Sequence, residues 1–279
     1  MSNNIATISY SVSIENNSIL FCKPTASAIL DRAESCTKNK EKLALLKELD
    51  LDGRMLALSV WYSKPTNCRH IEVPAPNGRS LFMSDPMTHG NSKIDKRCLC
   101  SDLVAVESCG NCENCKAECY AVKAQVQYFG TLAKRSINFW LAKNKPDFYF
   151  AQLDKQLTKE KREFCRPHTA GEFFDQEYVN NWIDLCGRHP EKRFWAYTKM
   201  QNILDFHYME QLKNFNLIYS FLPDGSLNFD DESKIVAKCR ALGVPVCKYR
   251  KGMSAAAMPH CGGSCKICLF SKYVGFVKH

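Results

Sequence analysis

Residues 98–120, CLCSDLVAVESCGNCENCKAECY, hold six of the sixteen cysteines of this 279-residue chain. The last four, Cys109, Cys112, Cys115 and Cys119, are spaced C-x2-C-x2-C-x3-C and form what we term the cysteine loop. Thiolates this close in sequence can converge on one point, and soft sulfur ligands select zinc or an iron–sulfur cluster. Buried or disulfide-bonded cysteines are the alternative, but the intervening Gly, Asn, Glu and Lys residues would make a poor apolar core. We therefore predict a metal site, and the nearly consecutive spacing favours iron–sulfur.

The composition predicts a globular protein with one large domain or two small ones. No apolar run approaches the length of a bilayer, and residues 1–17 lack the basic and apolar regions of a secretory signal. We therefore expect a cytoplasmic protein without a membrane partner, and structural disulfides are rare in that compartment. The net charge of +9 is compatible with a nucleic-acid partner.

Residues 1–97 form an N-terminal region of uncertain fold, which we expect to pack on a core formed by residues 98–279. Apolar periodicity in this region predicts a strand at 7–14 and a helix at 26–49. A buried strand is predicted at 55–62, and the Pro- and Gly-rich residues 63–97 are predicted as loop.

Beyond Cys119 the pattern alternates between helices and strands. Helices are predicted at 120–143, 147–161, 176–188, 201–213 and 233–242, and strands at 163–167, 193–198, 216–222 and 244–248. This alternation predicts an α/β fold with a parallel sheet and right-handed crossovers. A full eightfold barrel takes ~250 residues, so we expect a partial or compact parallel (β/α) barrel with cysteine-rich metal-binding loops.

Several polar residues lie at the predicted carboxyl ends of strands, where barrel enzymes place their chemistry. The candidate catalytic residues are Arg166, His168, Glu172 and Lys199, and the candidate cofactor contacts from strand ends are Tyr197 and Ser220. His168 and Glu172 could form a catalytic pair or a hydrogen-bonded pair in a polar layer. Arg166 could bind a carboxylate or phosphate, or pair with Glu172. Lys199 could contact a phosphate or be a solvated turn residue.

Other conspicuous side chains are assigned to the core. Helical or strand-like spacing predicts buried positions for five aromatic residues, Tyr128, Phe139, Trp140, Trp182 and Trp195. Cys165, Cys186 and Cys239 lie inside apolar elements, and we expect them to be buried and reduced.

A second cysteine group closes the chain, in the sequence HCGGSCKICLFSKYVGFVKH at residues 260–279. Its candidate metal ligands are Cys261, Cys265, Cys268 and His279, with Cys247 from the preceding predicted strand. Two alternatives stay open: a structural Cys3His zinc site, or an iron–sulfur cluster on four cysteines.

The order of motifs in residues 98–279 resembles the gene product eighty-eight family of phage proteins. The resemblance rests on six segments: residues 115–121, 135–138, 166–173, 178–182, 194–199 and 261–279. It implies a phage or mobile-element setting, and therefore the host cytoplasm, rather than a mechanism.

The layout is also similar to that of radical S-adenosylmethionine enzymes, in which a cysteine loop, a helix and a strand with a Gly-Gly-Glu-like turn follow one another. That resemblance implies an iron–sulfur cluster with three cysteine ligands: Cys112, Cys115 and Cys119. It also implies S-adenosylmethionine at Gly171 and Glu172. The loop spacing C-x2-C-x3-C departs from that superfamily's C-x3-C-x2-C, which occurs here only at residues 261–268.

Two further functions stay open. The C-terminal cysteines and residues 168–173 look like parts of the tRNA-guanine transglycosylase family, an α/β barrel with a Cys3His zinc site. This resemblance implies a zinc enzyme that modifies guanine in DNA or RNA, with Asp224 as nucleophile. Alternatively, both cysteine groups are structural zinc sites of a non-enzymatic nucleic-acid-binding protein.

Overall fold

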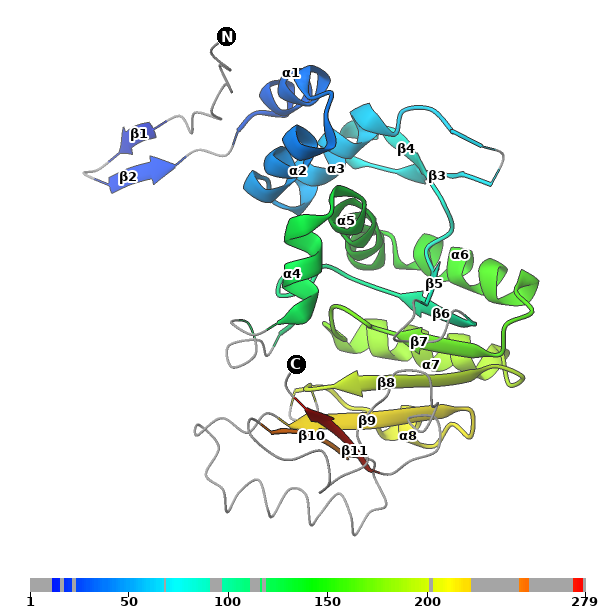
Figure 1. Cartoon of the computed structure of the whole chain (residues 1–279). Helices are drawn as coiled ribbons and strands as arrows, with labels where there is room; N and C mark the ends of the chain where they lie inside the picture. Colours follow the sequence, from blue (N-terminus) through cyan, green and yellow to red (C-terminus); the bar gives the residue numbers. More distant parts are fainter. Residues whose placement is uncertain are drawn as a thin grey trace. The chain divides into compact units, whose positions relative to one another are not determined.

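The computed structural model describes residues 24–67, 69–90, 97–110, 116, 119–200 and 203–220 with their side chains. The strand segments 12–15, 18–21, 246–250 and 273–277, and Phe221, are described by their backbone (Figure 1). The chain divides into two compact units, residues 1–85 with 126–140, and residues 86–125 with 141–279. None of the helices in this described part is long and apolar enough to cross a membrane.

The first unit contains three short helices, α1 (Ala26–Ser35), α2 (Asn39–Glu48) and α3 (Leu51–Trp61). The predicted helix at 26–49 is thus two helices. The predicted strand at 55–62 is wrong, because this segment belongs to α3. Asp50 caps α3 by accepting a hydrogen bond from the Gly53 amide at 2.9 Å. Residues 53–59 are all buried, Arg54 and Ser59 among them, so this stretch has no exposed polar face and lacks the periodicity that would reveal a helix.

The region predicted as loop contains a hairpin, formed by β3 (Ile71–Pro74) and β4 (Ser80–Met83) in antiparallel pairing. Asn77 and Gly78, with φ of 58° and 68°, make its turn. The described backbone of this unit also includes the hairpin β1 (Val12–Glu15) and β2 (Ser18–Phe21), which covers part of the predicted strand at 7–14. Residues 1–11 lie outside the described part.

The predicted helix at 120–143 is divided into α4 (Tyr120–Gln127) and α5 (Phe129–Asn144). The break falls at Tyr128, which is 56% exposed, so the prediction of a core position for this ring is wrong. The other four aromatic residues, Phe139, Trp140, Trp182 and Trp195, are buried as predicted.

The second unit is built on a seven-stranded sheet with the order β11-β10-β9-β8-β7-β6-β5. Its strands are β5 (Thr88–His89), β6 (Cys98–Ser101), β7 (Phe164–Pro167), β8 (Arg193–Thr198), β9 (Phe215–Phe221), β10 (Val246–Arg250) and β11 (Tyr273–Val277). All neighbours pair in parallel except β5 with β6. The predicted α/β class with a parallel sheet is confirmed, and the described strands form an open row that ends at β5 and β11.

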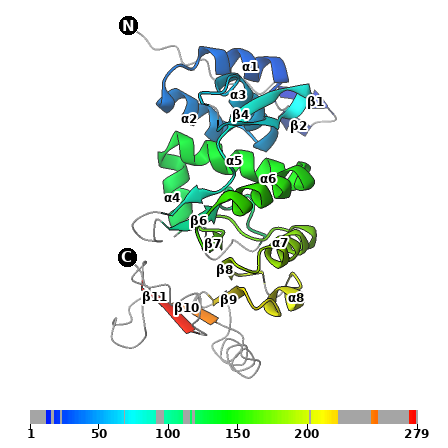
Figure 2. The ribbon, with the colours of Figure 1, turned by 90° about the vertical axis from the view of Figure 1, so that its right-hand side faces the viewer.

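Two helices cover one face of this sheet, α6 (Pro146–Lys159) and α7 (Gln176–Arg188), and Figure 2 shows both on the same side of the strands. The Ser101 and Tyr149 hydroxyls join β6 to α6 at 2.8 Å. Strands that follow one another in strict order by right-handed crossovers place their helices on one face, as seen here. The predicted helix at 201–213 shrinks to α8 (His207–Glu210), and the helix predicted at 233–242 lies outside the described residues.

Candidate functional site

The carboxyl ends of the parallel strands bring two segments together that are far apart in sequence. The β6–α4 loop, residues 102–119, leaves β6, and the His168–Glu172 turn leaves the adjacent strand β7. The His168 amide donates to the Ser101 carbonyl at 2.8 Å, and the Leu103 amide donates to the Ala170 carbonyl at 3.0 Å. The start of the β6–α4 loop is therefore bonded along its backbone to the His168–Glu172 turn.

Both ends of the β6–α4 loop are anchored on Thr169. At its start, the Asp102 carboxylate accepts from the Thr169 amide at 2.9 Å, the Thr169 hydroxyl at 2.6 Å and the Ala170 amide at 3.2 Å. At its end, the Tyr120 hydroxyl donates to the Thr169 carbonyl. The sequence interpretation missed Asp102 and Tyr120. A carboxylate directly after a strand, and a tyrosine directly after Cys119, were the signals that could have identified them.

Gly171 lets the turn pack closely against the β6–α4 loop. Its φ is +84°, and a Cβ there would lie 2.6 Å from Leu103 Cβ and 2.7 Å from Ser108 Oγ. Only glycine fits such a position without strain. The glycine is thus explained by contact between two segments of the chain, whereas the resemblance implied contact with a cofactor.

His168 has a buried structural position. Its φ is +59°, and its Nε2 lies 3.0 Å from the Tyr178 hydroxyl of α7. Its Nδ1 has no hydrogen-bond partner among the described residues. Burial, reinforced by the charge of Arg166, lowers the pKa of His168 to about 3, so the ring is neutral at neutral pH.

Glu172 is buried as well, and its carboxylate binds backbone amides rather than His168. It accepts from the Phe173 amide at 2.9 Å and from the Lys199 amide at 3.0 Å, which joins the turn to the end of β8. Burial raises the pKa of Glu172, although these hydrogen bonds oppose the shift. His168 and Glu172 thus bond different partners, and the predicted hydrogen-bonded pair between the two side chains is not formed.

The remaining predicted strand-end residues lie on β7, β8 and β9. The Arg166 guanidinium lies 5.0 Å from the centre of the Tyr197 ring and does not pair with Glu172. Ser220 in β9 is half-buried and is paired with Cys247 of β10 across the sheet.

The structure describes two of the nine predicted metal ligands with their side chains, Cys109 and Cys119, and both are half-buried. Cys247 is described by its backbone, and the other six lie outside the described residues: Cys112, Cys115, Cys261, Cys265, Cys268 and His279. Within the described part no group of three or more His, Cys, Asp or Glu side chains could hold a metal ion. Cys98 and Cys100 lie in β6 and are buried, as are Cys165 and Cys186, for which burial was predicted.

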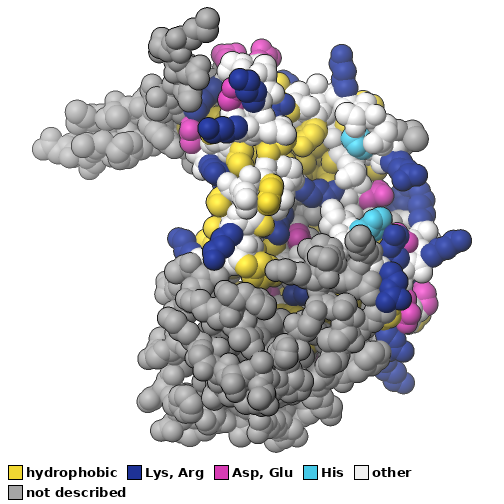
Figure 3. All heavy atoms as spheres, in the orientation of Figure 1, with side chains coloured by type: hydrophobic (Ala, Val, Ile, Leu, Met, Phe, Trp, Pro, Cys, Tyr) yellow, Lys and Arg dark blue, Asp and Glu magenta, His cyan; other side chains and the backbone are white. Residues whose placement is uncertain are grey.

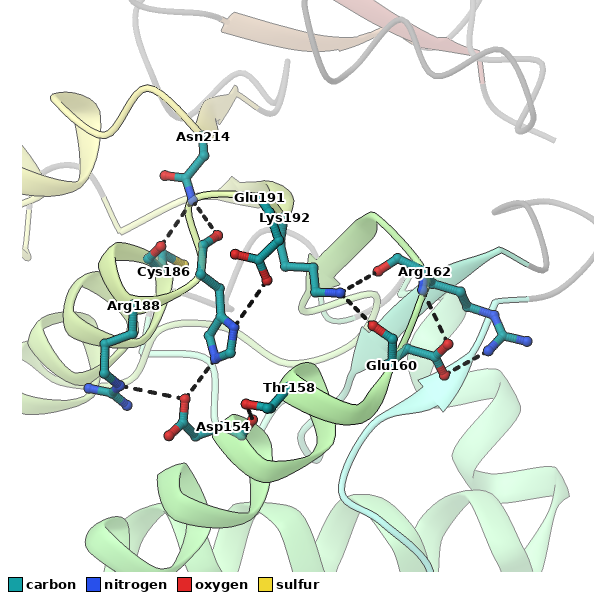
Figure 4. Close-up of polar contacts among 10 residues, drawn as sticks. Asp154, Thr158, Glu160, Arg162, Cys186, Arg188, Glu191, Lys192 and Asn214 are labelled. Carbon is teal, nitrogen blue, oxygen red and sulfur yellow. Dashed lines mark hydrogen bonds and ion pairs between the residues drawn. The ribbon is translucent and has the colours of Figure 1, made fainter.

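A second polar cluster, which the sequence interpretation missed, lies at the amino ends of the parallel strands, the amino edge of the sheet (Figure 4). His189 is buried, with its Nε2 2.6 Å from Asp154 Oδ1 of α6 and its Nδ1 3.4 Å from Glu191 Oε1. Lys192 donates to the Glu160 and Arg162 carbonyls at 2.5 and 3.0 Å. These contacts tie α6 to the segment that leads into β8, and they are the kind of structural network expected at the amino-terminal edge of parallel strands.

The family model for gene product 88 matches residues 84–237, which is more than half of the chain. The chain belongs to the gene product 88 family. Two curated relatives are the Gene 88 protein of Mycobacterium phage L5, 36% identical over 59 residues, and that of Mycobacterium phage D29, 32% identical over 75 residues. These alignments cover 21% and 26% of this chain, and the chain spans 25% and 31% of the two relatives. No solved structure matches.

The gene product 88 match spans the segments at the carboxyl ends of the parallel strands, which we term the carboxyl edge of the sheet. It runs from the residues before β5 to beyond β9, and so includes the cysteine loop and the His168–Glu172 turn. The predicted membership in a phage protein family is therefore confirmed.

Proposed function

We propose that this chain is an iron–sulfur enzyme whose cluster is bound by the cysteine loop, with the layout of radical S-adenosylmethionine enzymes. The observation that supports this most strongly is the position of the loop. It leaves β6, the first of six parallel strands paired in strict chain order, and its ends are anchored on the turn that follows β7. Catalytic groups of parallel α/β proteins lie at this edge.

The described residues fit a cluster in two respects. Cys109 and Cys119 have partial solvent access, whereas Cys98, Cys100, Cys165 and Cys186 are buried in the core. Four soft sulfur donors within eleven residues suit an iron–sulfur cluster. Cys112, Cys115 and Cys119 are the proposed ligands, with Cys109 as the fourth sulfur of the loop. A bound cluster would supply one-electron redox chemistry.

The fit to S-adenosylmethionine is poorer at the residue that the resemblance implied. The Glu172 carboxylate is buried and already accepts the Phe173 and Lys199 amides. We therefore assign Glu172 to the positioning of the His168–Glu172 turn and derive no step through that cofactor.

The placement of α6 and α7 on one face of the sheet supports the predicted partial barrel. Helices on one face of consecutive parallel strands produce a singly wound sheet, which is the arrangement found in (β/α) barrels. We propose that β6–β11 form such a partial barrel, in the host cytoplasm.

The test is metal analysis of variants purified without oxygen. Cys119→Ser should lose most of the iron and the broad visible absorbance of the wild type, because it removes a proposed ligand. Cys36→Ser is the matched control, since Cys36 is also half-buried and free but follows α1 in the other unit. Equal iron in Cys119→Ser and wild type would refute the assignment, and zinc without iron would favour the zinc-based alternatives.

A further inference from the structure

Arg166 has an unsatisfied donor on the sheet face opposite the helices. It is paired with Cys100 across β6 and β7, so the two side chains share one face. Side chains alternate between the two faces along a strand, so Cys165 and Ser101 point to the other face, where the Ser101 hydroxyl bonds Tyr149 of α6. Arg166 Nε is shielded from solvent and has no acceptor among the described residues. A buried donor without an acceptor is costly, so this position requires an explanation.

The surroundings of Arg166 are aromatic and favour its charge. The Tyr197 ring lies 5.0 Å from the guanidinium, a distance at which stacking fixes the guanidinium plane. Burial opposes the charge, but the neighbouring Tyr120, Tyr197, Cys100 and Asp102 outweigh it and raise the pKa of Arg166. The described hydrogen bonds of the Asp102 carboxylate go to Thr169 and Ala170.

Tyr120 supplies a second element of the site. Its hydroxyl is tied to the Thr169 carbonyl, yet the residue is 65% exposed, far more than a tyrosine needs for a structural hydrogen bond. Basic and hydrophobic side chains lie side by side on the surface over α4, the helix that Tyr120 begins (Figure 3). An anchored and exposed ring is a suitable platform for stacking a planar base.

We propose that Arg166 binds the phosphate of a nucleotide, with Tyr197 orienting the guanidinium and Tyr120 presenting a stacking surface to the base. The planar fork of arginine matches phosphate oxygens, and the net charge of +9 suits an anionic substrate. A carboxylate would also satisfy Arg166, but it has no planar ring to stack on the exposed face of Tyr120. This inference rests on the proposed function and names its substrate class, either a free nucleotide or a phosphate within single-stranded nucleic acid.

The test is equilibrium binding of AMP, of adenosine and of a short single-stranded oligothymidine to the full chain. We expect AMP to bind and adenosine to bind much more weakly, with inorganic phosphate competing against AMP. Arg166→Gln should weaken AMP binding roughly 10- to 100-fold, as expected for loss of a charge-assisted hydrogen-bonded fork. Arg193→Gln is the control, because Arg193 lies at the start of β8 and pairs with Glu163. Tighter binding of oligothymidine than of AMP would identify single-stranded nucleic acid as the source of the phosphate. Tighter binding of AMP would identify a free nucleotide.

Equal binding of AMP and adenosine by the wild type would overturn the proposal without any variant. Equal AMP binding by wild type and a folded Arg166→Gln would do the same. Iron is measured in the same samples, so absence of iron would count against the proposed enzyme class alone. If the protein contains iron but binds AMP and adenosine equally, the result would count against this inference alone.

Discussion

Asp102 is the residue on which the geometry of the carboxyl edge depends most. Its carboxylate accepts hydrogen bonds from the Thr169 and Ala170 amides and from the Thr169 hydroxyl. Thr169 and Ala170 are both buried. Asp102→Ala leaves these donors without their acceptor, so we predict a loss of about 2–4 kcal/mol in the free energy of unfolding, measured in denaturant. Asp31→Ala, at an exposed carboxylate 3.5 Å from the Ser27 hydroxyl, should change it by less than about 0.5 kcal/mol. Equal effects of the two substitutions would show that Asp102 does not hold the turn.

His168 predicts a specific dependence of stability on pH. Its pKa is about 3 in the folded protein and about 6.5 in an unfolded chain, so the unfolded state binds more protons between these values. Stability from this group is present above about pH 6.5 and is lost as the pH falls toward 3.

His168→Asn should make the loss of stability with acid shallower over this window, measured by denaturant unfolding at several pH values. Asparagine tolerates the positive φ of this position and does not titrate. Parallel pH profiles for the variant and wild type would contradict the neutral, buried state of His168.

The interactions of these single residues could not be predicted from sequence. Asp102 and Thr169 are 67 residues apart, and only the pairing of β6 with β7 brings them together. Spacing predicted that Arg166, His168 and Glu172 lie near a strand end. It could not show that the His168 and Glu172 side chains turn inward, because that depends on hydrogen bonds to the Tyr178 hydroxyl and to the Lys199 backbone amide.

At the scale of elements, the close contact between the His168–Glu172 turn and the β6–α4 loop depends on Gly171. Gly171→Ala combines an unfavourable positive φ with overlap of the new Cβ on Leu103 and Ser108. We predict destabilisation of about 2–4 kcal/mol, measured by denaturant unfolding.

Gly130→Ala is the matched comparison. A Cβ at this position in α5 meets nothing within 4 Å, so alanine should stabilise the helix by up to about 1 kcal/mol. A neutral Gly171→Ala variant would mean that the turn and the loop are not in close contact.

The capped, amphipathic helix α7 was predicted correctly. The helix predicted at 176–188 has the bounds of α7, and Asp175 caps it by accepting from the Tyr178 amide at 2.8 Å. The failures have physical causes: α3 is buried on every side over residues 53–59, and the hairpin β3–β4 lies in a Pro- and Gly-rich stretch that resembles loop.

In the second unit as a whole, substitutions at the amino edge of the sheet should lower stability without affecting iron content, unlike substitutions of the cysteine loop at the carboxyl edge. His189→Phe removes the contacts with Asp154 and Glu191 at the amino edge. We predict a loss of about 1–3 kcal/mol in the free energy of unfolding with no loss of iron per folded chain. Glu191→Gln, at a more exposed site, should have little effect on either quantity. Loss of iron in folded His189→Phe would argue against confining the site to the carboxyl edge.

The general architecture could be predicted because strand–helix alternation specifies a parallel sheet. The division into units could not, because residues 126–140 join the first unit although they follow the cysteine loop in sequence. The C-terminal cysteine group lies outside the described residues, and its metal stays a prediction.

The proposed function depends on an iron–sulfur cluster bound by the cysteine loop. The most direct measurement is the iron, acid-labile sulfide and zinc content per chain of wild-type protein purified without oxygen. We predict iron and sulfide in nearly equal amounts, as in a cluster, with zinc confined to the C-terminal group if it is present at all. Stoichiometric zinc with neither iron nor sulfide would contradict an iron–sulfur cluster in the cysteine loop.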